Sequence, residues 1–285
     1  MSAFVEQAAV GVEPPLTVIE PSVGWMSLRL KELWAYRELF YFLAWRDVKV
    51  RYKQTALGIA WVVVQPVVQM ILFTAVFGHV AKLPSQGVPY PLFTFAALLP
   101  WTLFSGALAR AGISVVGSAQ LISKIYFPRL IIPLSAVLAN LVDFAVSVLV
   151  LAALMAYYGY VPPLAAVTLP LFVLLTIVTA VGVGLWFGAL NVRYRDIGYI
   201  IPFLLQVWMF ASPIAYSSTL ISHSYAWVYS LNPIATVADG FRWSLLGTAP
   251  PQLTNVVSSV SVAVVVAVTG AFYFRRLEKT FADVV

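Results

Sequence analysis

Six long apolar runs divide this chain, and each can cross a lipid bilayer as a helix. The runs cover residues 57–80, 92–116, 131–157, 164–190, 199–216 and 255–274. A helix needs about 20 mostly apolar residues to cross the hydrocarbon core, and only 199–216 is short by that measure. With 61% hydrophobic and 10% charged residues, a soluble domain of 285 residues could not keep its apolar surface from water. The sequence therefore predicts an all-α polytopic membrane protein with six transmembrane helices.

Basic residues lie on one side of the predicted membrane. Most of the 17 Lys and Arg residues fall before residue 57, in 117–130, in 191–198 and after 274. The segments expected on the other side hold Lys82 and Arg242. Because Lys and Arg are enriched in cytoplasmic loops, both termini are predicted to be cytoplasmic. An even number of spans gives the same result, and this placement explains the net charge of +6 without a nucleic-acid partner.

The segments before and after the spans divide the chain further. Residues 27–56 alternate charged and apolar side chains at helical spacing and contain several aromatic residues, namely Trp34, Tyr41 and Trp45. This pattern predicts an amphipathic helix on the cytoplasmic membrane surface, in contact with membrane lipids; a helix packed on the protein is the alternative. Residues 1–26 are predicted to be a disordered tail, 57–274 the six-span domain and 275–285 a cytoplasmic tail.

The longest connection, residues 217–254, is predicted to lie outside. Asn232 followed by Pro233 is typical of a helix start, with the asparagine as the cap. Apolar residues then recur at helical spacing. The sequence therefore predicts one or two short helices between spans five and six, lying at or dipping into the outer membrane boundary.

Motifs of common enzyme classes are absent from the sequence. It has no G-x-x-x-x-G-K-[ST] phosphate loop, no H-E-x-x-H, no paired carboxylate motif and no G-x-S-x-G elbow. There is no cysteine, which excludes thiolate metal sites and thiol catalysis. His79 and His223 have no acidic cluster beside them in the sequence, so no metal site is predicted. We therefore expect neither catalytic residues nor a cofactor on this chain.

Two charged residues fall inside the spans. Asp143 lies near the middle of the third run, beside Asn140, and Arg110 lies near the cytoplasmic end of the second. Such residues are candidates for function by default. The alternatives are that Arg110 extends to the headgroups and that Asp143 pairs across helices or lines a wet cavity. A single acid does not favour an ion-coupled transporter.

Polar and aromatic side chains inside the spans are candidates to line a channel. The set consists of Trp61, Gln65, Gln69, Gln206 and Trp208. Gln65 and Gln69 are four residues apart, so they share one face of the first span with Trp61. Amides can bond sugar hydroxyls, and aromatic faces can pack on sugar C–H surfaces. The alternative is ordinary helix packing with amide bonds between spans.

The segment Arg46–Trp61, with Gln65–Pro66 after it, carries a resemblance to a known family. It resembles the start of the first span in membrane subunits of ATP-binding-cassette polysaccharide exporters, which move O-antigen, capsule or teichoic-acid chains. Other similar motifs follow in order: Lys124–Pro128, Asn191–Asp196, Ser212–Ile214 and Asn232–Pro233. The resemblance runs from about residue 30 to the end. It implies a type-2 exporter permease that translocates lipid-linked polysaccharide, O-antigen first, across the bacterial inner membrane.

The resemblance also implies partners. It implies a homodimer with a channel between two six-span subunits, and two separate cytoplasmic ATPase subunits that hold ATP and Mg. The missing phosphate loop agrees with an energy source on another chain. By similarity the 117–130 loop couples to the ATPase through the residues Lys124, Ile125, Tyr126, Phe127 and Pro128. A loop at the membrane interface would use the same residue types.

A substrate contact is implied at the bend before the first span. Leu57 and Gly58 would form the bend, since glycine permits a tight turn. Arg51 and Lys53 would hold the pyrophosphate of the lipid-linked glycan, because both residue types bind phosphate. The rule that places basic residues in the cytoplasm explains the same two side chains. The short external helices in 217–254 would act as a gate.

Three rival functions stay open. An exporter of a small lipid or drug from the same superfamily would have a drier pocket. A membrane enzyme acting on polyprenyl lipids would need an acidic or histidine cluster at one membrane face. A structural membrane anchor would not need glutamine and tryptophan inside its spans.

Overall fold

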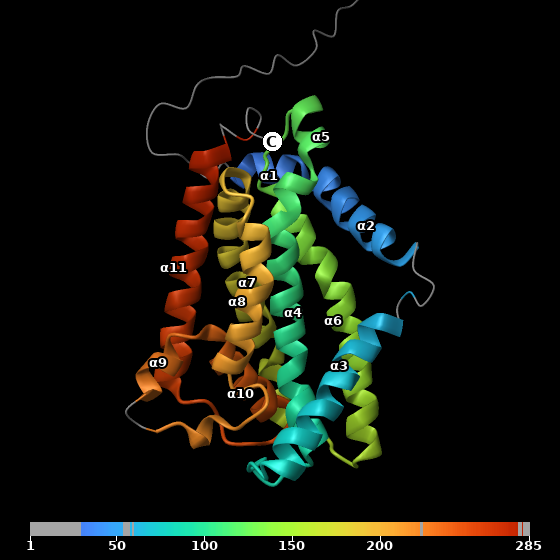
Figure 1. The fold of residues 1–285 in the computed structure, drawn as a ribbon, viewed down its shortest axis with the longest axis vertical. Helices are drawn as coiled ribbons and strands as arrows, with labels where there is room; N and C mark the ends of the chain where they lie inside the picture. Colours follow the sequence, from blue (N-terminus) through green and yellow to red (C-terminus); the bar gives the residue numbers. More distant parts are fainter. Residues whose placement is uncertain (1–29, 54–57, 59, 223–224, 279–280, 282–285) are drawn as a thin grey trace, which may run out of the picture.

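The computed structural model describes residues 30–53, 58, 60–222, 225–278 and 281. In chain order its elements are α1 (Leu30–Ala35), α2 (Arg37–Lys53), α3 (Ala60–Phe73), η1 (Thr74–Val80), α4 (Tyr90–Gly117), α5 (Ala119–Lys124), α6 (Ile131–Tyr157), η2 (Leu164–Thr168), α7 (Leu169–Arg193), α8 (Ile197–Ala211), η3 (Ser218–Leu220), α9 (Ala226–Ser230), α10 (Pro233–Leu246) and α11 (Leu253–Leu277). Figure 1 shows a bundle of long, roughly parallel helices. The calls on residues 1–26 and on Leu57 lie outside the described residues.

The prediction of an all-α polytopic membrane protein is confirmed. The structure is 82% helical, and the described residues contain no strand. Five helical segments are long and apolar enough to cross a membrane: Ala60–Val80, α4, α6, Leu164–Arg193 and α11. They match five of the six apolar runs to within a few residues. The sixth, predicted at 199–216, is the shorter helix α8, which ends at Ala211 because the chain turns extended at Ser212.

Helix α4 is the centre of the bundle. Of its apolar 18-residue window 78% is buried, against 17–28% in the other four long segments. It packs on α3, α6, α7, α8 and α10, as the central ribbon of Figure 1 shows. A helix surrounded on every side needs apolar residues all round, and α4 has them. The outer helices keep one apolar face for lipid or for another subunit.

The two ends of the bundle differ. Helices α1 and α5, the turn between α7 and α8, and the end of α11 lie together at one end (Figure 1). We call this the basic end, because Lys124, Arg193, Arg275 and Arg276 lie in the last turns there. Helix α9 and the loop after η1 lie at the opposite end. The segments that the charge pattern assigned to one side of the membrane are therefore together in space.

The segment predicted as one helix over 27–56 is described over residues 30–53, where it forms two helices and α2 is not flat on the basic end. A turn at Tyr36 separates α1 from α2. Pairs of adjacent residues that recur every four positions in α2, starting from Leu39 and Phe40, are shielded from solvent. This face of α2 packs on α6. Figure 1 shows α2 running obliquely from the basic end along α6. The exposed face of α2 carries the aromatic residues Tyr41, Phe42 and Trp45, and Trp34 is exposed on α1.

Close contact between α7 and α11 depends on glycine. A Cβ on Gly270 would lie 2.5 Å from the carbonyl oxygen of Gly182, and a Cβ on Gly182 would lie 2.7 Å from the amide nitrogen of Ala267. Both neighbours are backbone atoms in helices, so they cannot rotate away. Small residues let transmembrane helices approach closely in this way.

We expect Gly270→Ala to destabilise the protein, because one methyl group forces α7 and α11 apart. Overpacking of this kind costs roughly 1–3 kcal/mol, visible as a lower midpoint of thermal unfolding in detergent. Gly117→Ala is the matched control, since a Cβ there meets nothing within 4 Å. Equal midpoints for the two variants would show that the contact is not tight.

Candidate functional site

An open groove lies along α3, between α4 and α6, and reaches the end of α2. Its volume is about 670 Å³, within the range of ligand-binding clefts. Polar and aromatic side chains contribute to its walls, and they are Arg51, Tyr52, Trp61, Gln65, Gln69, Trp101, Thr102, Ser105, Arg110, Asn140, Asp143 and Ser147. Groups of this kind inside spanning helices need a wet environment or a partner. The groove is therefore the main candidate for a transport path.

Several of the predicted site residues meet in this groove. Trp61, Gln65 and Gln69 line it together from α3, as their spacing predicted. Trp61 is 49% exposed, so it is accessible from outside the single subunit. Arg51 and Gly58 line the end of the groove nearest α2. Gly58 has a φ of +44°, a left-handed conformation that favours glycine and fits the predicted bend.

Three predicted residues do not line the groove. Lys53 is exposed at the end of α2. Gln206 is exposed on α8. The Trp208 Nε1–H donates to the Asn232 side chain at 3.0 Å, and its ring packs edge-on against Phe104 at 5.0 Å. Trp208 therefore ties α8 to the start of α10 within this subunit, and a channel role for Gln206 and Trp208 stays a prediction.

A charged cluster joins three elements at the groove. The Asp143 carboxylate of α6 accepts hydrogen bonds from the Arg51 guanidinium and the Tyr52 hydroxyl of α2. It also pairs with the Arg110 Nη2 of α4 at 3.2 Å. Burial and the neighbouring carboxylate raise the pKa of Tyr52 to about 12, so its hydroxyl stays a donor. Asp143 therefore pairs across helices and also lines the open groove.

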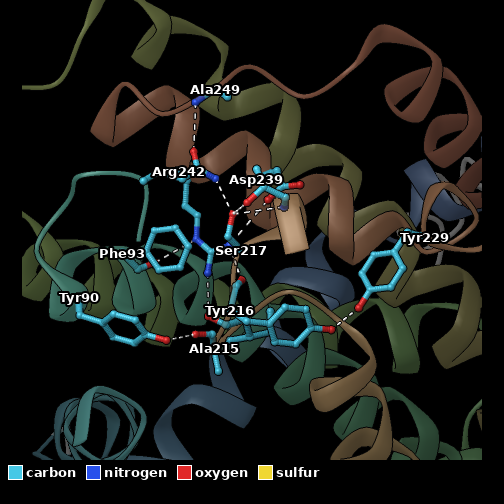
Figure 2. A network of polar contacts seen from close by, with 12 residues as sticks. Tyr90, Phe93, Ala215, Tyr216, Ser217, Tyr229, Asp239, Arg242 and Ala249 are labelled. Atoms are coloured by element: carbon cyan, nitrogen blue, oxygen red, sulfur yellow. Dashed lines mark hydrogen bonds and ion pairs between the residues drawn. The ribbon is translucent and has the colours of Figure 1, made fainter. Parts of the chain in front are cut away.

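Helix α10 is held in place by Arg242, which is 1% exposed (Figure 2). Its Nε donates to the Phe93 carbonyl at 3.1 Å, and its two terminal nitrogens donate to the Tyr216 and Ile214 carbonyls at 3.2 and 2.8 Å. The guanidinium also lies 3.6 Å from the centre of the Phe93 ring. One side chain of α10 thus holds α4 and the turn that follows α8.

Helix α10, predicted to lie at or dip into the outer membrane boundary, packs within the bundle. It begins as predicted, with Pro233 in the first turn and the Asn232 side chain accepting from the Ile234 amide at 3.1 Å. Most of its residues are buried, and it packs on α4, α7 and α11. From the sequence, Arg242 was identified only as a basic residue on the outer side of the membrane, and this role was missed. The useful signal was its spacing of three from Asp239, whose carboxylate lies 3.7 Å away.

The predicted coupling segment divides into an exposed part and a buried part. Lys124, Ile125 and Tyr126 are exposed at the basic end, with Tyr126 66% exposed. Phe127 is 3% exposed and belongs to an apolar cluster with Phe274 and other buried residues. Pro128 is also buried. Exposed residues can meet a partner, whereas Phe127 and Pro128 can act only by fixing the loop.

Polar contacts fasten this loop to the end of α11. The Arg129 guanidinium donates to the Glu278 carbonyl. The Glu278 carboxylate accepts from Arg275 at 2.8 Å, and Arg275 also lies 3.8 Å from Glu32 in α1. Burial raises the pKa of the Glu278 carboxyl, and Arg275 opposes that shift. These contacts tie the loop to the end of α11, and α11 to α1.

Comparison with known proteins places this architecture in a family. Residues 38–246 match the ABC-2 type transporter family. The O-antigen export system permease protein RfbA of Myxococcus xanthus is 28% identical over 257 residues, covering 89% of this chain and 98% of the relative. RfbA of Klebsiella pneumoniae is 28% identical over 262 residues, covering 91% and 100%.

A more distant match points the same way. The polysialic acid transport protein KpsM of Escherichia coli is 24% identical over 243 residues, covering 82% of this chain and 91% of the relative. The relatives are permease subunits rather than enzymes, which removes the polyprenyl-lipid enzyme from the alternatives. The chain belongs to the ABC-2 type transporter family, as a multi-pass permease subunit that works with a separate ATPase subunit.

Proposed function

We propose that this chain is the transmembrane subunit of an ATP-driven exporter of lipid-linked polysaccharide, with O-antigen as the first candidate cargo. The observation that carries the proposal is the groove, in which the two glutamine amides and the tryptophan ring of α3 lead to the guanidinium groups of Arg51 and Arg110. Such walls suit a chain of sugars on a phosphorylated lipid. The names of the relatives support the same cargo class.

The proposed assembly has two copies of this chain and two ATPase subunits, which hold ATP and Mg. A single subunit leaves the groove open along one side, with Trp61 and Gln65 exposed to the outside. A second copy facing it would enclose a polar passage between apolar outer surfaces. The proposed site is the inner membrane of a bacterium, with the basic end and both termini in the cytoplasm.

In the proposed cycle the cargo approaches from the cytoplasmic leaflet and its pyrophosphate meets Arg51, with Lys53 nearby. ATP-dependent closure of the partner subunits pushes on the exposed residues Lys124, Ile125 and Tyr126. A ligand shifts a conformational equilibrium only if it binds the two states differently, so nucleotide-driven dimerisation is the driver. The buried end of the loop transmits the motion to α11, and α10 controls the exit.

The rival function of exporting a small apolar drug predicted a drier pocket. Asp143, Arg110 and Gln65 instead place charged and amide groups in this groove, inside the spanning helices. A structural anchor would have no need of such a groove. Charged groups at this depth cost free energy, so an anchor would be more stable without them.

The experiment that tests the function is export by a reconstituted complex. The chain and its ATPase partner are placed in proteoliposomes with lipid-linked O-antigen, and glycan reaching the far face is measured with a membrane-impermeant glycosidase or lectin. We expect accessibility to rise with ATP and not with a non-hydrolysable analogue. Translocation of small apolar dyes but no glycan under ATP would reject the proposal.

A further inference from the structure

The cluster around Asp143 carries more positive than negative charge. Two guanidinium groups, from Arg51 and Arg110, share one carboxylate. The Nη1 of Arg110 is buried and has no hydrogen-bond partner among the described residues. In a low-dielectric setting such a surplus cation is costly and attracts an anion. The cluster is therefore an anion-binding arrangement in which a protein side chain supplies only part of the negative charge.

The position of the cluster makes it accessible to a ligand. Asp143 is 12 residues into α6, about 18 Å from the start of that helix at 1.5 Å per residue. Arg51, Arg110 and Asp143 all line the open groove. An anionic group travelling through the groove would therefore reach both guanidinium groups.

The donors around Asp143 are those that a phosphate would need. Arginine binds carboxylate and phosphate in the same forked geometry, and a hydroxyl can donate to either. A pyrophosphate carries more negative charge than one carboxylate, so it interacts more strongly with two guanidiniums at the same distance. Exchange of one anion for another avoids leaving either arginine unpaired inside the membrane.

We propose that Asp143 is a resident stand-in for the phosphate of the cargo: it occupies Arg51, Arg110 and Tyr52 at rest, and an incoming phosphate or pyrophosphate displaces it. Arg110 is then a substrate-binding residue, and Asp143 sets how strong an anion must be to enter. Displacement also breaks the polar contacts that Arg51 and Tyr52 of α2 make with α6. The inference rests on the proposed function only for the identity of the anion.

The test is equilibrium binding to the complete complex with its ATPase partner in nanodiscs. The probes are a short polyprenyl pyrophosphate, the matching polyprenol and inorganic pyrophosphate, and tryptophan fluorescence reports binding. We expect Asp143→Asn to lower the Kd for polyprenyl pyrophosphate about tenfold, because the competing charge is gone. Arg110→Gln should raise it about tenfold, because Arg51 and Asp143 then neutralise each other.

Matched variants separate this role from a structural one. Asp47→Asn removes a carboxylate from α2 that pairs with the adjacent Arg46 and does not line the groove, so its Kd should equal that of the unmodified complex. Asp143→Glu keeps the competitor and should also bind like the unmodified complex. Equal gains for Asp47→Asn and Asp143→Asn would reduce the effect to net charge and overturn the proposal.

The remaining outcomes are decisive in the same way. Unchanged affinity in Arg110→Gln overturns the proposal even if Asp143→Asn does not fold. Binding of inorganic pyrophosphate as tight as that of the polyprenyl form assigns the site to a free anion, and equal binding of the polyprenol excludes anion recognition. Because binding needs no export, predicted affinities without glycan export would reject the proposed function and leave the exchange intact.

Discussion

Arg242→Met is expected to cause the largest loss of stability of any single change in the outer half of the protein. The substitution leaves the carbonyls of Phe93, Ile214 and Tyr216 without their buried donor and leaves Asp239 without its cation. Removing one member of a buried ionic pair costs about 3–5 kcal/mol. We expect a sharply lower midpoint of thermal unfolding in detergent and little protein in the membrane fraction.

Two further variants separate the effect of the positive charge of Arg242 from the effect of its hydrogen-bonding geometry. Lys82→Met removes a positive charge at the same end of the bundle from an exposed position, and it should unfold like the unmodified protein. Arg242→Lys keeps the charge, but a single ammonium cannot match the planar fork that reaches three carbonyls. Its stability should fall between the other two. A stable, export-competent Arg242→Met variant would contradict the role of this residue in the gate.

Replacing Ile125 and Tyr126 together with alanine should uncouple ATP hydrolysis from export while the fold stays intact. Both side chains project from the basic end, with exposures of 56% and 66%, so their loss removes contact area without opening a cavity. Aromatic anchors dominate interface energies, and losing one can cost 2 kcal/mol or about thirtyfold in binding. ATPase activity of the complex and glycan export, measured on the same proteoliposomes, report the result.

Phe127→Ala should behave differently, although it is the next residue. Its ring is buried with Phe274 and Phe281, so truncation costs about 3–5 kcal/mol and lowers stability before it affects coupling. Gln120→Ala, on the exposed side of α5, is the control and should leave both activities unchanged. If the Ile125 and Tyr126 variant exports normally, the loop is not the contact to the ATPase.

The sequence predicted the spans because apolar length is a direct consequence of bilayer thickness. It placed the start of α10 at Asn232, since a cap and a proline are local signals, and it grouped Trp61, Gln65 and Gln69, since helical spacing is local too. Contacts between elements that are distant in the sequence could not be predicted from such local signals. No local pattern around Asp143 predicts that it pairs with Arg51 or Arg110, which are distant in the sequence. The burial of Arg242 follows only from the packing of α10.

The coupling segment shows the same division within five residues. Composition marked Tyr126 and Phe127 alike as aromatic residues in a basic loop. The helix α5 ends at Lys124, and the backbone is extended at Ile125. Adjacent side chains of extended backbone point to opposite sides, so Tyr126 faces outward and Phe127 faces inward. Only the fold distinguishes a docking residue from a packing residue here.

Helix α8 has 15 residues and so covers about 22 Å of a hydrocarbon layer about 30 Å thick. Lipid would have to thin around an isolated helix of that length. Here the chain continues through a turn and a bend whose carbonyls, at Ile214 and Tyr216, are bonded to a buried guanidinium. Backbone that is satisfied by protein needs no help from the bilayer. Export should therefore depend less on the acyl-chain length of the surrounding lipid than it would if α8 were a short, isolated helix.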